Sequence, residues 1–364
     1  MKNVFGNNLT VTLFGESHGA SIGAVIDGIA PGIAVDYDFI NDLLSKRRPF
    51  GDISTPRRET DEFTIQSGVF EGKTTGTPIC ILIPNNDTRS KDYSDTRFLA
   101  RPSHADFTAF SKYHGYEDYR GGGHFSGRIT AALVAVGGIL IPALEKKGIK
   151  IGTHIKKCAT VCDREFGDFK TDIEFLNKQD FAVLDTSAKD KMIENIRNAH
   201  SKGDSVGGVL ETAVIGLPEG LGEPWFDTVE SMLSHALFSI PAVKAVEFGA
   251  GFSLCDMQGS VANDQFFMKD GRVETLTNNS GGINGGITNG MPVIFRIGFR
   301  PTPTISKEQS TVNMETLTNA TLSSKGRHDP CIVHRARVVA DSVTAIVLAD
   351  MLTTRYGTDW LGME

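Results

Sequence analysis

The hydrophobic pattern divides the chain into short strands and longer helices. Compact apolar runs, or runs in which apolar and polar residues alternate, predict strands at residues 10–14, 63–66, 79–83, 208–216 and 293–299. Apolar residues that recur every three or four positions predict helices at residues 37–46, 129–147, 190–201, 228–238 and 336–356. Asp36 is a candidate N-cap of the first helix, because its carboxylate can accept a hydrogen bond from a first-turn amide.

The order of these segments bears on the fold class. Strands and helices mix without a regular strand–helix–strand period, which favours a layered α+β fold over a doubly wound parallel sheet. The 364 residues suffice for one large domain or two ordinary ones, and no Pro/Ser-rich hinge divides them. Two polar segments, 86–95 and 263–279, are predicted to be loops or mobile flaps.

Composition and charge narrow the class of ligand. Hydrophobic residues make up 40% of the chain and charged residues 22%, which is typical of a globular protein with a sizeable core. The formal net charge of −7 argues against a general nucleic-acid surface. Basic residues nevertheless cluster at Lys46-Arg47-Arg48 and at Arg57-Arg58. Such local clusters on an acidic protein favour a small anionic ligand.

The sequence gives little indication of a membrane segment, of disulfide bonds or of a metal site. The N-terminal residues show no apolar signal-peptide core, and the longest apolar run, 129–144, is shorter than the roughly 20 residues that span a bilayer. We therefore expect a buried helix there and no membrane association. The five cysteines are scattered, which indicates reduced thiols in the cytosol. Cys158 and Cys162 form CxxxC without a second pair at zinc spacing, so we predict structural thiols and no metal.

The run Arg120-Gly121-Gly122-Gly123-His124-Phe125-Ser126-Gly127-Arg128 is the most informative in the chain. Consecutive glycines let backbone amides approach a ligand, and the predicted helix that follows adds its dipole, so the loop can seat an anion. A phosphorylated ligand is the functional interpretation. A plain glycine turn before a core helix is the alternative.

Three further polar clusters could carry acid–base chemistry. His18 lies in GESHG and His104 in RPSHAD, each beside small residues in a predicted turn. Asp329 precedes Pro330, which favours an extended conformation that could project its carboxylate. Each of these residues could equally serve an ordinary turn. A doubled GGI unit and the Arg300-Pro301-Thr302-Pro303-Thr304 loop could contact a flat ring or a phosphate, and a simple hairpin is the alternative.

Common nucleotide and hydrolase motifs are poorly matched. The chain has no lysine-containing P-loop, and Gly121-Gly122-Gly123 does not begin GxGxxG. GESHG satisfies GxSxG, but no HGGG-type oxyanion loop accompanies it, so a hydrolase is only a weak alternative.

Taken together, the ordered motifs resemble the chorismate synthase family. The resemblance runs from Phe5-Gly6 to about Tyr356. It is carried by GESHG, DGIAPG, KRRPF, SGVFEGKTTGTPI, RPSHAD, RGGG, SIPAVK, the doubled GGI, RPTPT and GRHDP.

The resemblance implies a fold and an activity. The expected fold is α+β, a layered β-α-α-β sandwich in a single domain over residues 1–364. The expected enzyme is a carbon–oxygen lyase acting on phosphates. It would release phosphate from 5-enolpyruvylshikimate 3-phosphate by 1,4-trans elimination and give chorismate for aromatic amino acid biosynthesis. Reduced FMN would be required without net redox change, because an electron-rich dihydroflavin can lend charge to the substrate.

It also implies partners and a location. We expect a cytoplasmic homotetramer that binds a small-molecule substrate and neither nucleic acid nor membrane. The chain carries no flavin-reductase module, so an external reductase would supply the reduced flavin, with NADPH as an indirect reductant.

The resemblance further assigns roles to individual residues. His18 would act as an acid, His104 would protonate the flavin system, and Asp329 would relay a proton near flavin N5. Substrate-binding residues would be Arg48, Arg101 and Arg128. FMN contacts would be Arg47, His124, Phe125, Ser126, Pro241, Ala242, Gly285, Arg300, Pro301, Thr302, Pro303, Thr304 and Arg327.

The chain departs from the family pattern at a few positions. Many members carry RSSARET where this chain has His124-Phe125-Ser126-Gly127-Arg128-Ile129-Thr130, and a common lysine is Arg300 here. Two other function classes stay open at this stage. One is an FMN-dependent oxidoreductase with net hydride transfer, and the other is a non-catalytic flavin- or phosphate-binding module.

Overall fold

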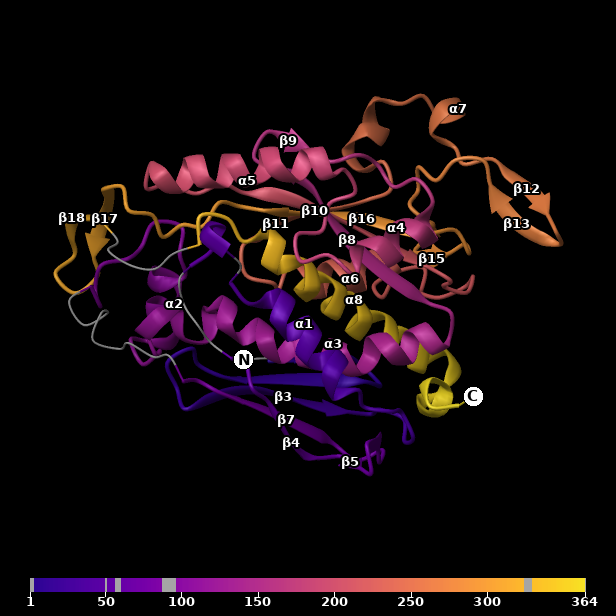
Figure 1. Cartoon of the computed structure of the whole chain (residues 1–364), viewed down its shortest axis with the longest axis horizontal. Helices are drawn as coiled ribbons and strands as arrows, with labels where there is room; N and C mark the ends of the chain where they lie inside the picture. The colour runs from indigo at the N-terminus through magenta and orange to yellow at the C-terminus, as the bar shows by residue number, and fades with distance from the viewer. Residues whose placement is uncertain (1–2, 50, 56–59, 87–95, 324–328, 364) are drawn as a thin grey trace.

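The computed structural model describes residues 3–49, 51–55, 60–86, 96–323 and 329–363. Two five-stranded antiparallel sheets enclose a double layer of helices (Figure 1). The first sheet has the order β1-β2-β3-β7-β4. Its strands are β1 (Val4–Phe5), β2 (Thr10–Gly15), β3 (Ser21–Asp27), β7 (Ile79–Pro84) and β4 (Thr64–Ser67).

The second sheet lies on the opposite side of the helices. Its order is β11-β16-β10-β8-β9. Its strands are β11 (Val243–Phe248), β16 (Val293–Phe299), β10 (Gly208–Ile215), β8 (Lys150–Cys158) and β9 (Val161–Cys162).

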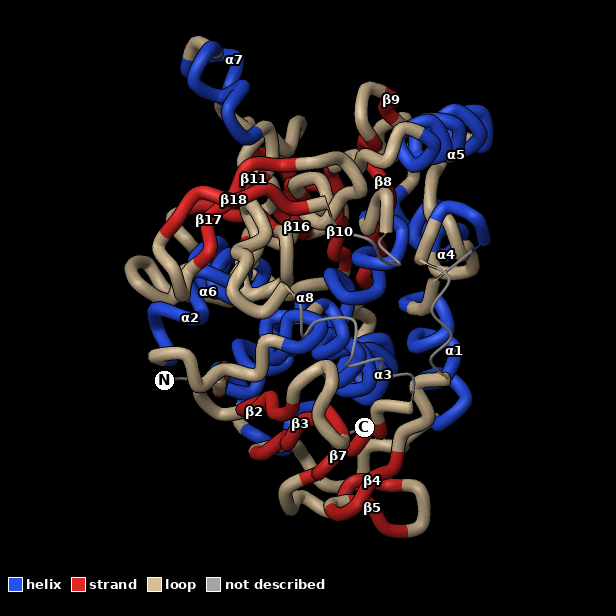
Figure 2. Tube along the Cα trace, turned by 90° about the vertical axis from the view of Figure 1, so that its left-hand side faces the viewer, coloured by secondary structure: helices blue, strands red, loops and turns tan. Residues whose placement is uncertain are grey.

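The helix layers fill the space between the sheets. Helix α3 (Thr130–Lys146) packs on β3 and β7, helix α8 (Val333–Tyr356) packs on β8 and β10, and the two helices pack on each other. Helices α1 (Tyr37–Arg47) and α6 (Val229–Leu237) complete the layers. Helices α4 (Phe169–Leu176) and α5 (Thr186–Ser201) lie outside the second sheet, and Figure 2 shows the layers edge-on. The predicted α+β fold, with a β-α-α-β sandwich at its centre, is confirmed.

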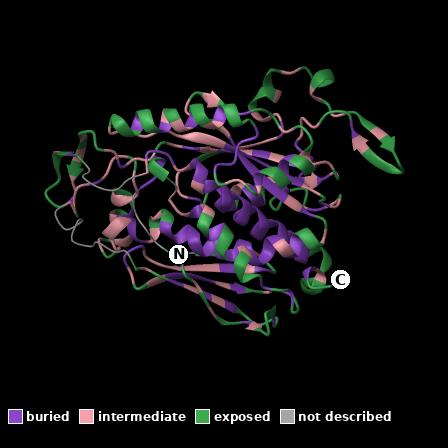
Figure 3. Cartoon of the chain, in the orientation of Figure 1, coloured by how far each residue is buried: buried purple, intermediate pink, exposed green. Residues whose placement is uncertain are grey.

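The core is built around two central helices that are buried on nearly every side. All residues of α8 from Ala336 to Thr353 are buried, as is most of α3 (Figure 3). Gly137 of α3 lies against α8, and a Cβ there would come 2.4 Å from the Cβ of Ser342. The absence of a side chain therefore lets the two helices approach closely. The apolar stretch Gly127–Lys146 is long enough to cross a membrane, but 89% of its most apolar window is buried inside the protein, which makes it a core helix.

Most predicted elements are present with shifted ends. The strands predicted at 10–14 and 293–299 become β2 and β16, and the helix predicted at 336–356 begins three residues earlier. Asp36 caps α1, since its Oδ1 accepts from the Phe39 amide at 2.9 Å. The sequence patterns above did not predict β3, β8 and β11.

The prediction of a polar loop at 263–279 is wrong. This segment contains a hairpin of β12 (Phe266–Lys269) and β13 (Arg272–Thr275). The turn is Asp270-Gly271, with φ of 50° and 79°, the conformation that Asp-Gly favours between two strands. Of the segment 86–95, residues 87–95 lie outside the described part of the chain.

The doubled GGI unit is also a hairpin. Its strands β14 (Ile283–Asn284) and β15 (Ile287–Thr288) pair across Gly285 and Gly286. The remaining elements are short. They are α2 (Asp106–Tyr113), α7 (Gly259–Ala262), β5 (Val69–Phe70), β6 (Lys73–Thr74), β17 (Gln309–Asn313) and β18 (Thr318–Leu322).

A buried charge network ties the outer segments to the second sheet. His154 of β8 is fully buried, with Nδ1 2.7 Å from Asp163 and Nε2 3.0 Å from Glu211. Burial by itself lowers the pKa of His154, but the hydrogen bonds with the two carboxylates outweigh it and raise the pKa above the usual 6.5. Both ring nitrogens face acceptors, so both donate and the imidazole is held as a cation.

We expect the free energy of unfolding to fall as the pH rises through the raised pKa of His154. A raised folded-state pKa gives stability that is fully present below the unfolded value of about 6.5 and is lost above the folded value. Urea titrations between pH 6 and pH 9 measure this slope. The variant His154→Gln should lose it, whereas a variant of the exposed His200 on α5 should keep it. Equal slopes in both variants and the wild type would contradict the assignment.

Candidate active site

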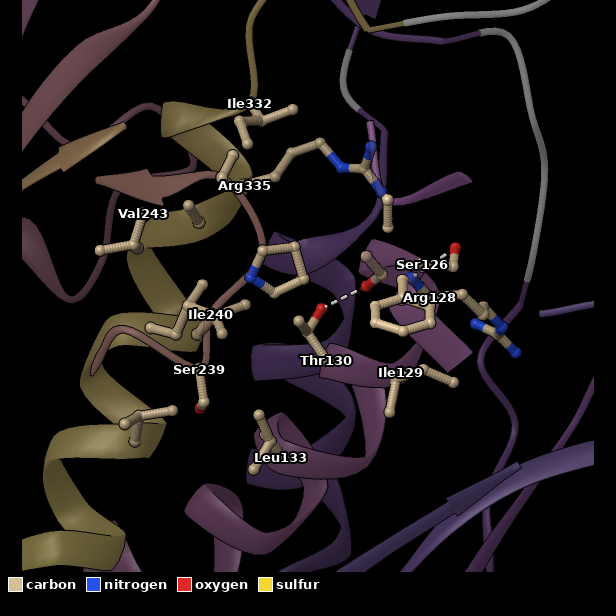
Figure 4. Close-up of a pocket in the computed structure, with 18 of the residues that line it drawn as sticks. Ser126, Arg128, Ile129, Thr130, Leu133, Ser239, Ile240, Val243, Ile332 and Arg335 are labelled. Atoms are coloured by element: carbon tan, nitrogen blue, oxygen red, sulfur yellow. Dashed lines mark hydrogen bonds between the residues drawn. The ribbon is translucent and has the colours of Figure 1, made fainter. Parts of the chain in front are cut away.

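A cavity of about 800 Å³ lies beside the first turns of α3 and α8. This volume is near the upper end of the range of about 300–1,000 Å³ that is usual for ligand pockets. Figure 4 shows residues of the α3 start, of the segment after α6 and of the α8 start facing this space. Its walls also include the glycine-rich loop before α3 and part of the segment that follows β16. Segments distant in the sequence therefore build one site.

The glycine-rich loop passes between the two predicted catalytic histidines. Gly121 and Gly122 have φ of 60° and 92°, in the region that favours glycine. A Cβ on Gly121 would lie 2.5 Å from Nε2 of His18, and one on Gly122 would lie 3.2 Å from Cε1 of His104. Any side chain at Gly121 would displace the His18 ring. The glycines are therefore required by close packing against imidazoles, and not only by a turn.

Hydrogen bonds lock this loop to the GESHG segment. The Ser17 amide donates to Gly123 O at 3.1 Å, and Ser17 Oγ donates to Arg120 O at 3.2 Å. His124 Nδ1 donates to Gly15 O at 2.7 Å. Because Nδ1 carries this proton, Nε2 is the acceptor of the neutral His124 ring.

A buried carboxylate joins two of the predicted ligand-binding arginines. Asp61 is fully buried and accepts from Arg47 Nη2 at 2.8 Å and from Arg128 Nη1. Burial by itself raises the pKa of Asp61, but the charges of Arg47 and Arg128 outweigh it and hold the pKa below its usual value. Arg128 also donates to the Asn85 side chain at 3.0 Å and to Pro84 O at 3.1 Å. Both guanidiniums thus have a fixed position before any ligand binds.

A second carboxylate, Asp106, serves Arg101 and His104. Arg101 pairs with it through Nε and Nη2, both at 2.7 Å, and His104 Nδ1 lies 2.8 Å from Oδ1. Burial by itself raises the pKa of Asp106, but hydrogen bonds from Arg101 and His104 outweigh it and lower the pKa far below its usual value.

The third carboxylate is Asp329. Its Oδ1 accepts from the Thr55 amide at 2.9 Å, and its Oδ2 accepts from Arg335 Nη1. Arg335 also donates from Nε to Arg47 O at 2.8 Å. The side chain of Asp329 is therefore held in place at the cavity wall, by an arginine in the first turn of α8.

Two cations of the cavity wall have no carboxylate partner within the described part of the chain. They are Arg300 and Lys244. Burial lowers the pKa of the Arg300 guanidinium, because no nearby anion compensates its charge. The Oγ1 of Thr302 is buried and forms no hydrogen bond with a described residue. The wall thus offers uncompensated positive charge and an unused polar atom.

Comparison with known proteins agrees with this geometry. A sequence profile of the family described as chorismate synthase matches residues 9–353. The chain belongs to the chorismate synthase family. Its function is therefore that of a lyase of the shikimate pathway, in the biosynthesis of aromatic compounds.

Individual relatives support this over nearly the full length. The chorismate synthase of Thermococcus kodakarensis is 44% identical over 358 residues, covering 98% of this chain and 99% of that protein. That of Pyrococcus abyssi is 46% identical over 350 residues, covering 96% and 97%. A crystal structure of a chorismate synthase superposes with a TM-score of 0.76 at 29% identity, covering 98% of this chain and 94% of that one.

Most residues predicted from the family resemblance line the one cavity. They are His104, Asp329, Arg47, Arg101, Arg128, His124, Phe125, Ser126, Pro241, Ala242, Arg300, Thr302, Pro303 and Thr304. Four others are not among its lining residues. His18 is 8% exposed and packs against Gly121, which does line the cavity, while Pro301 lies between two lining residues. Arg48 donates to Thr60 O at 3.2 Å, and Gly285 forms the β14–β15 turn. Arg327, Arg57 and Arg58 lie outside the described residues.

The sequence argument missed four residues of this site. Asp61 and Arg335 had no local signal, because each meets its partners only in the folded chain. Lys244 stood in SIPAVK without an assigned role. Asp106 stood two positions after His104 in RPSHAD, and this spacing could have suggested the pair.

We expect Gly121→Ala to destabilise the protein and to lower its activity, because the methyl group would displace His18 and the backbone conformation is unfavourable for alanine. The cost should be about 1–3 kcal/mol in the free energy of unfolding, measured with urea. Gly127→Ala is the matched stability control in the same loop, since a Cβ there meets nothing within 4 Å. If both variants unfold alike, the close packing against His18 carries no energetic weight.

Proposed function

We propose that this chain eliminates phosphate from 5-enolpyruvylshikimate 3-phosphate to give chorismate, with reduced FMN bound in the cavity and no net redox change. The observation that carries the proposal is the convergence of His104, Asp329 and three arginine–carboxylate groups on one cavity. This arrangement pairs proton-transfer groups with anion-binding groups, as loss of a phosphate requires.

The residues present fit a phosphorylated flavin. Arg300, which has no carboxylate partner among the described residues, and the buried Thr302 Oγ1 could satisfy polar atoms of such a ligand. Phe125, Leu133 and Ile240 add an apolar wall suited to a flat ring. When bound, reduced FMN would supply electron density to the substrate while the C–O bond breaks.

The cations have separate tasks in this proposal. Arg101 and Arg128 line the cavity with guanidiniums that their carboxylate partners fix in place, and they would hold the carboxylates and phosphate of the substrate. Lys244 adds a further charge to the wall. In a site that excludes water, fixed cations stabilise the charge of a departing phosphate more strongly than solvent does.

Three groups would handle protons. His104 would donate from its cavity-side nitrogen, and Asp329 would hold or pass on a proton at the cavity wall. His18 would act as an acid from its place beside Gly121, a residue that lines the cavity. Arg48 and Gly285 stay proposed ligands although neither lines this cavity, and Arg327 stays a proposed ligand that lies outside the described residues.

The subunit number, cellular location and flavin supply are proposed from the family resemblance. We propose a cytoplasmic homotetramer supplied by an external flavin reductase, with NADPH consumed only to reduce FMN. Light scattering after size exclusion measures the subunit number.

We expect the protein to form chorismate and phosphate in equal amounts from 5-enolpyruvylshikimate 3-phosphate under anaerobic conditions with reduced FMN. Product absorbance and a phosphate assay measure both. Folded protein that forms neither product would refute the proposal. Consumption of NADPH in proportion to turnover would instead support an FMN-dependent oxidoreductase.

We expect Asp329→Asn to lower kcat by at least about 100-fold, the usual range for loss of an acid–base group. FMN affinity should stay nearly unchanged, because the amide has the same size as the carboxylate. Steady-state kinetics and a flavin fluorescence titration measure the two effects. A large loss of flavin affinity with unchanged kcat would assign Asp329 a binding role.

A further inference from the structure

Asp106 receives four hydrogen bonds from two neighbours in the chain. Oδ2 accepts from the Arg101 amide at 2.9 Å and from Arg101 Nε at 2.7 Å. Oδ1 accepts from Arg101 Nη2 at 2.7 Å and lies 2.8 Å from His104 Nδ1. The side chains of all three residues are 17–18% exposed, so water competes weakly for these bonds.

The backbone is shaped to bring these groups together. The His104 amide donates to Arg101 O at 3.0 Å, which closes a turn, and Ser103 within it has a φ of 59°. A non-glycine residue in this region carries strain of about 1–3 kcal/mol. Asp106 then begins helix α2, where a carboxylate interacts favourably with the helix dipole. The turn is anchored to β17 through the Ala100 amide, which donates to Val312 O at 3.3 Å.

This arrangement fixes the chemistry of the His104 ring. An ionised carboxylate can only accept, so Nδ1 must carry the proton that it shares with Asp106. Nε2 is then the one ring nitrogen left to exchange a proton with a ligand. The ring packs against Gly122, which limits its rotation. The charge of Asp106 is itself secured by Arg101.

We propose that Asp106 is the positioning residue of His104, which orients the imidazole and assigns proton exchange with the ligand to Nε2. Arg101 keeps Asp106 ionised and in place. The inference rests on the proposed function for its effect on turnover, but the orientation of the ring does not depend on it. Asp106 itself touches neither substrate nor cofactor.

The first test separates positioning from folding. Asp106→Ala should lower kcat at least about tenfold and leave the KM for FMN within about twofold, whereas the KM for substrate should rise because Arg101 loses its carboxylate partner. Asp172→Ala is the matched control. Asp172 also accepts a bidentate pair, from Arg164 at 2.9 and 2.6 Å, and a backbone amide, from Gly167 at 2.8 Å, but within the described residues it forms no hydrogen bond with a histidine and does not line the cavity. A kcat of Asp106→Ala equal to that of the control would overturn the proposal.

The second test asks whether Asp106 acts through His104. If it does, adding Asp106→Ala to His104→Ala should cause no further loss of kcat at saturating substrate, because the imidazole that Asp106 orients is already absent. A further loss of tenfold or more in the double variant would show an independent role and overturn the proposal. If Asp106→Ala does not fold, Asp106→Asn takes its place in both tests.

The third test needs no activity. Long-range ¹H–¹⁵N spectra of protein labelled at histidine report which ring nitrogen carries the proton, and the His104 signals are identified by their absence in His104→Gln. We expect the Nδ1–H form in the neutral wild-type ring and its loss in Asp106→Ala. An Nε2–H form in the wild type would overturn the proposal. An inactive wild type with an Nδ1–H ring would refute the proposed function alone.

Discussion

Buried carboxylates that compensate arginines are the constraint on which this structure depends. Gathering several guanidiniums around one cavity is unfavourable unless each charge has a partner, since burial of an unpaired charge costs several kcal/mol. Asp61 compensates Arg47 and Arg128, Asp106 compensates Arg101, and Asp329 compensates Arg335. Asp61 joins segments that are far apart in the sequence, whereas Asp106 and Asp329 each pair with an arginine five or six positions away. The same bonds therefore hold the walls together and keep the cations in place for a ligand.

Arg300 and Lys244 differ from these arginines in having no carboxylate partner among the described residues. They line the same cavity, and burial lowers the pKa of Arg300. An anionic ligand would supply the missing charge. The compensated arginines thus have fixed positions in the site, while the charges of Arg300 and Lys244 are left for an anionic ligand to compensate.

The glycine-rich loop provides the second constraint. It has no side chains at Gly121 and Gly122, so His18 and His104 can pack against its two sides. Rigid contacts of this kind would hold the proposed acid–base groups within the small tolerance that proton transfer requires. The loop is in turn bonded to the GESHG segment through Ser17 and His124. Loss of one glycine would therefore disturb several functional groups at once.

The sequence alone determined the long elements, the family and the local motifs. Apolar periodicity located α1, α3 and α8 because helices buried in a core repeat their apolar residues along the whole length. The His104–Asp106 pair could also have been predicted from the sequence, because the two residues stand two positions apart in one short turn. Tertiary structure alone decided the rest. Asp61 meets Arg128, and Asp329 meets Thr55, across 67 and 274 positions of the chain. No local pattern encodes such contacts, because they exist only once two sheets have closed around the helices.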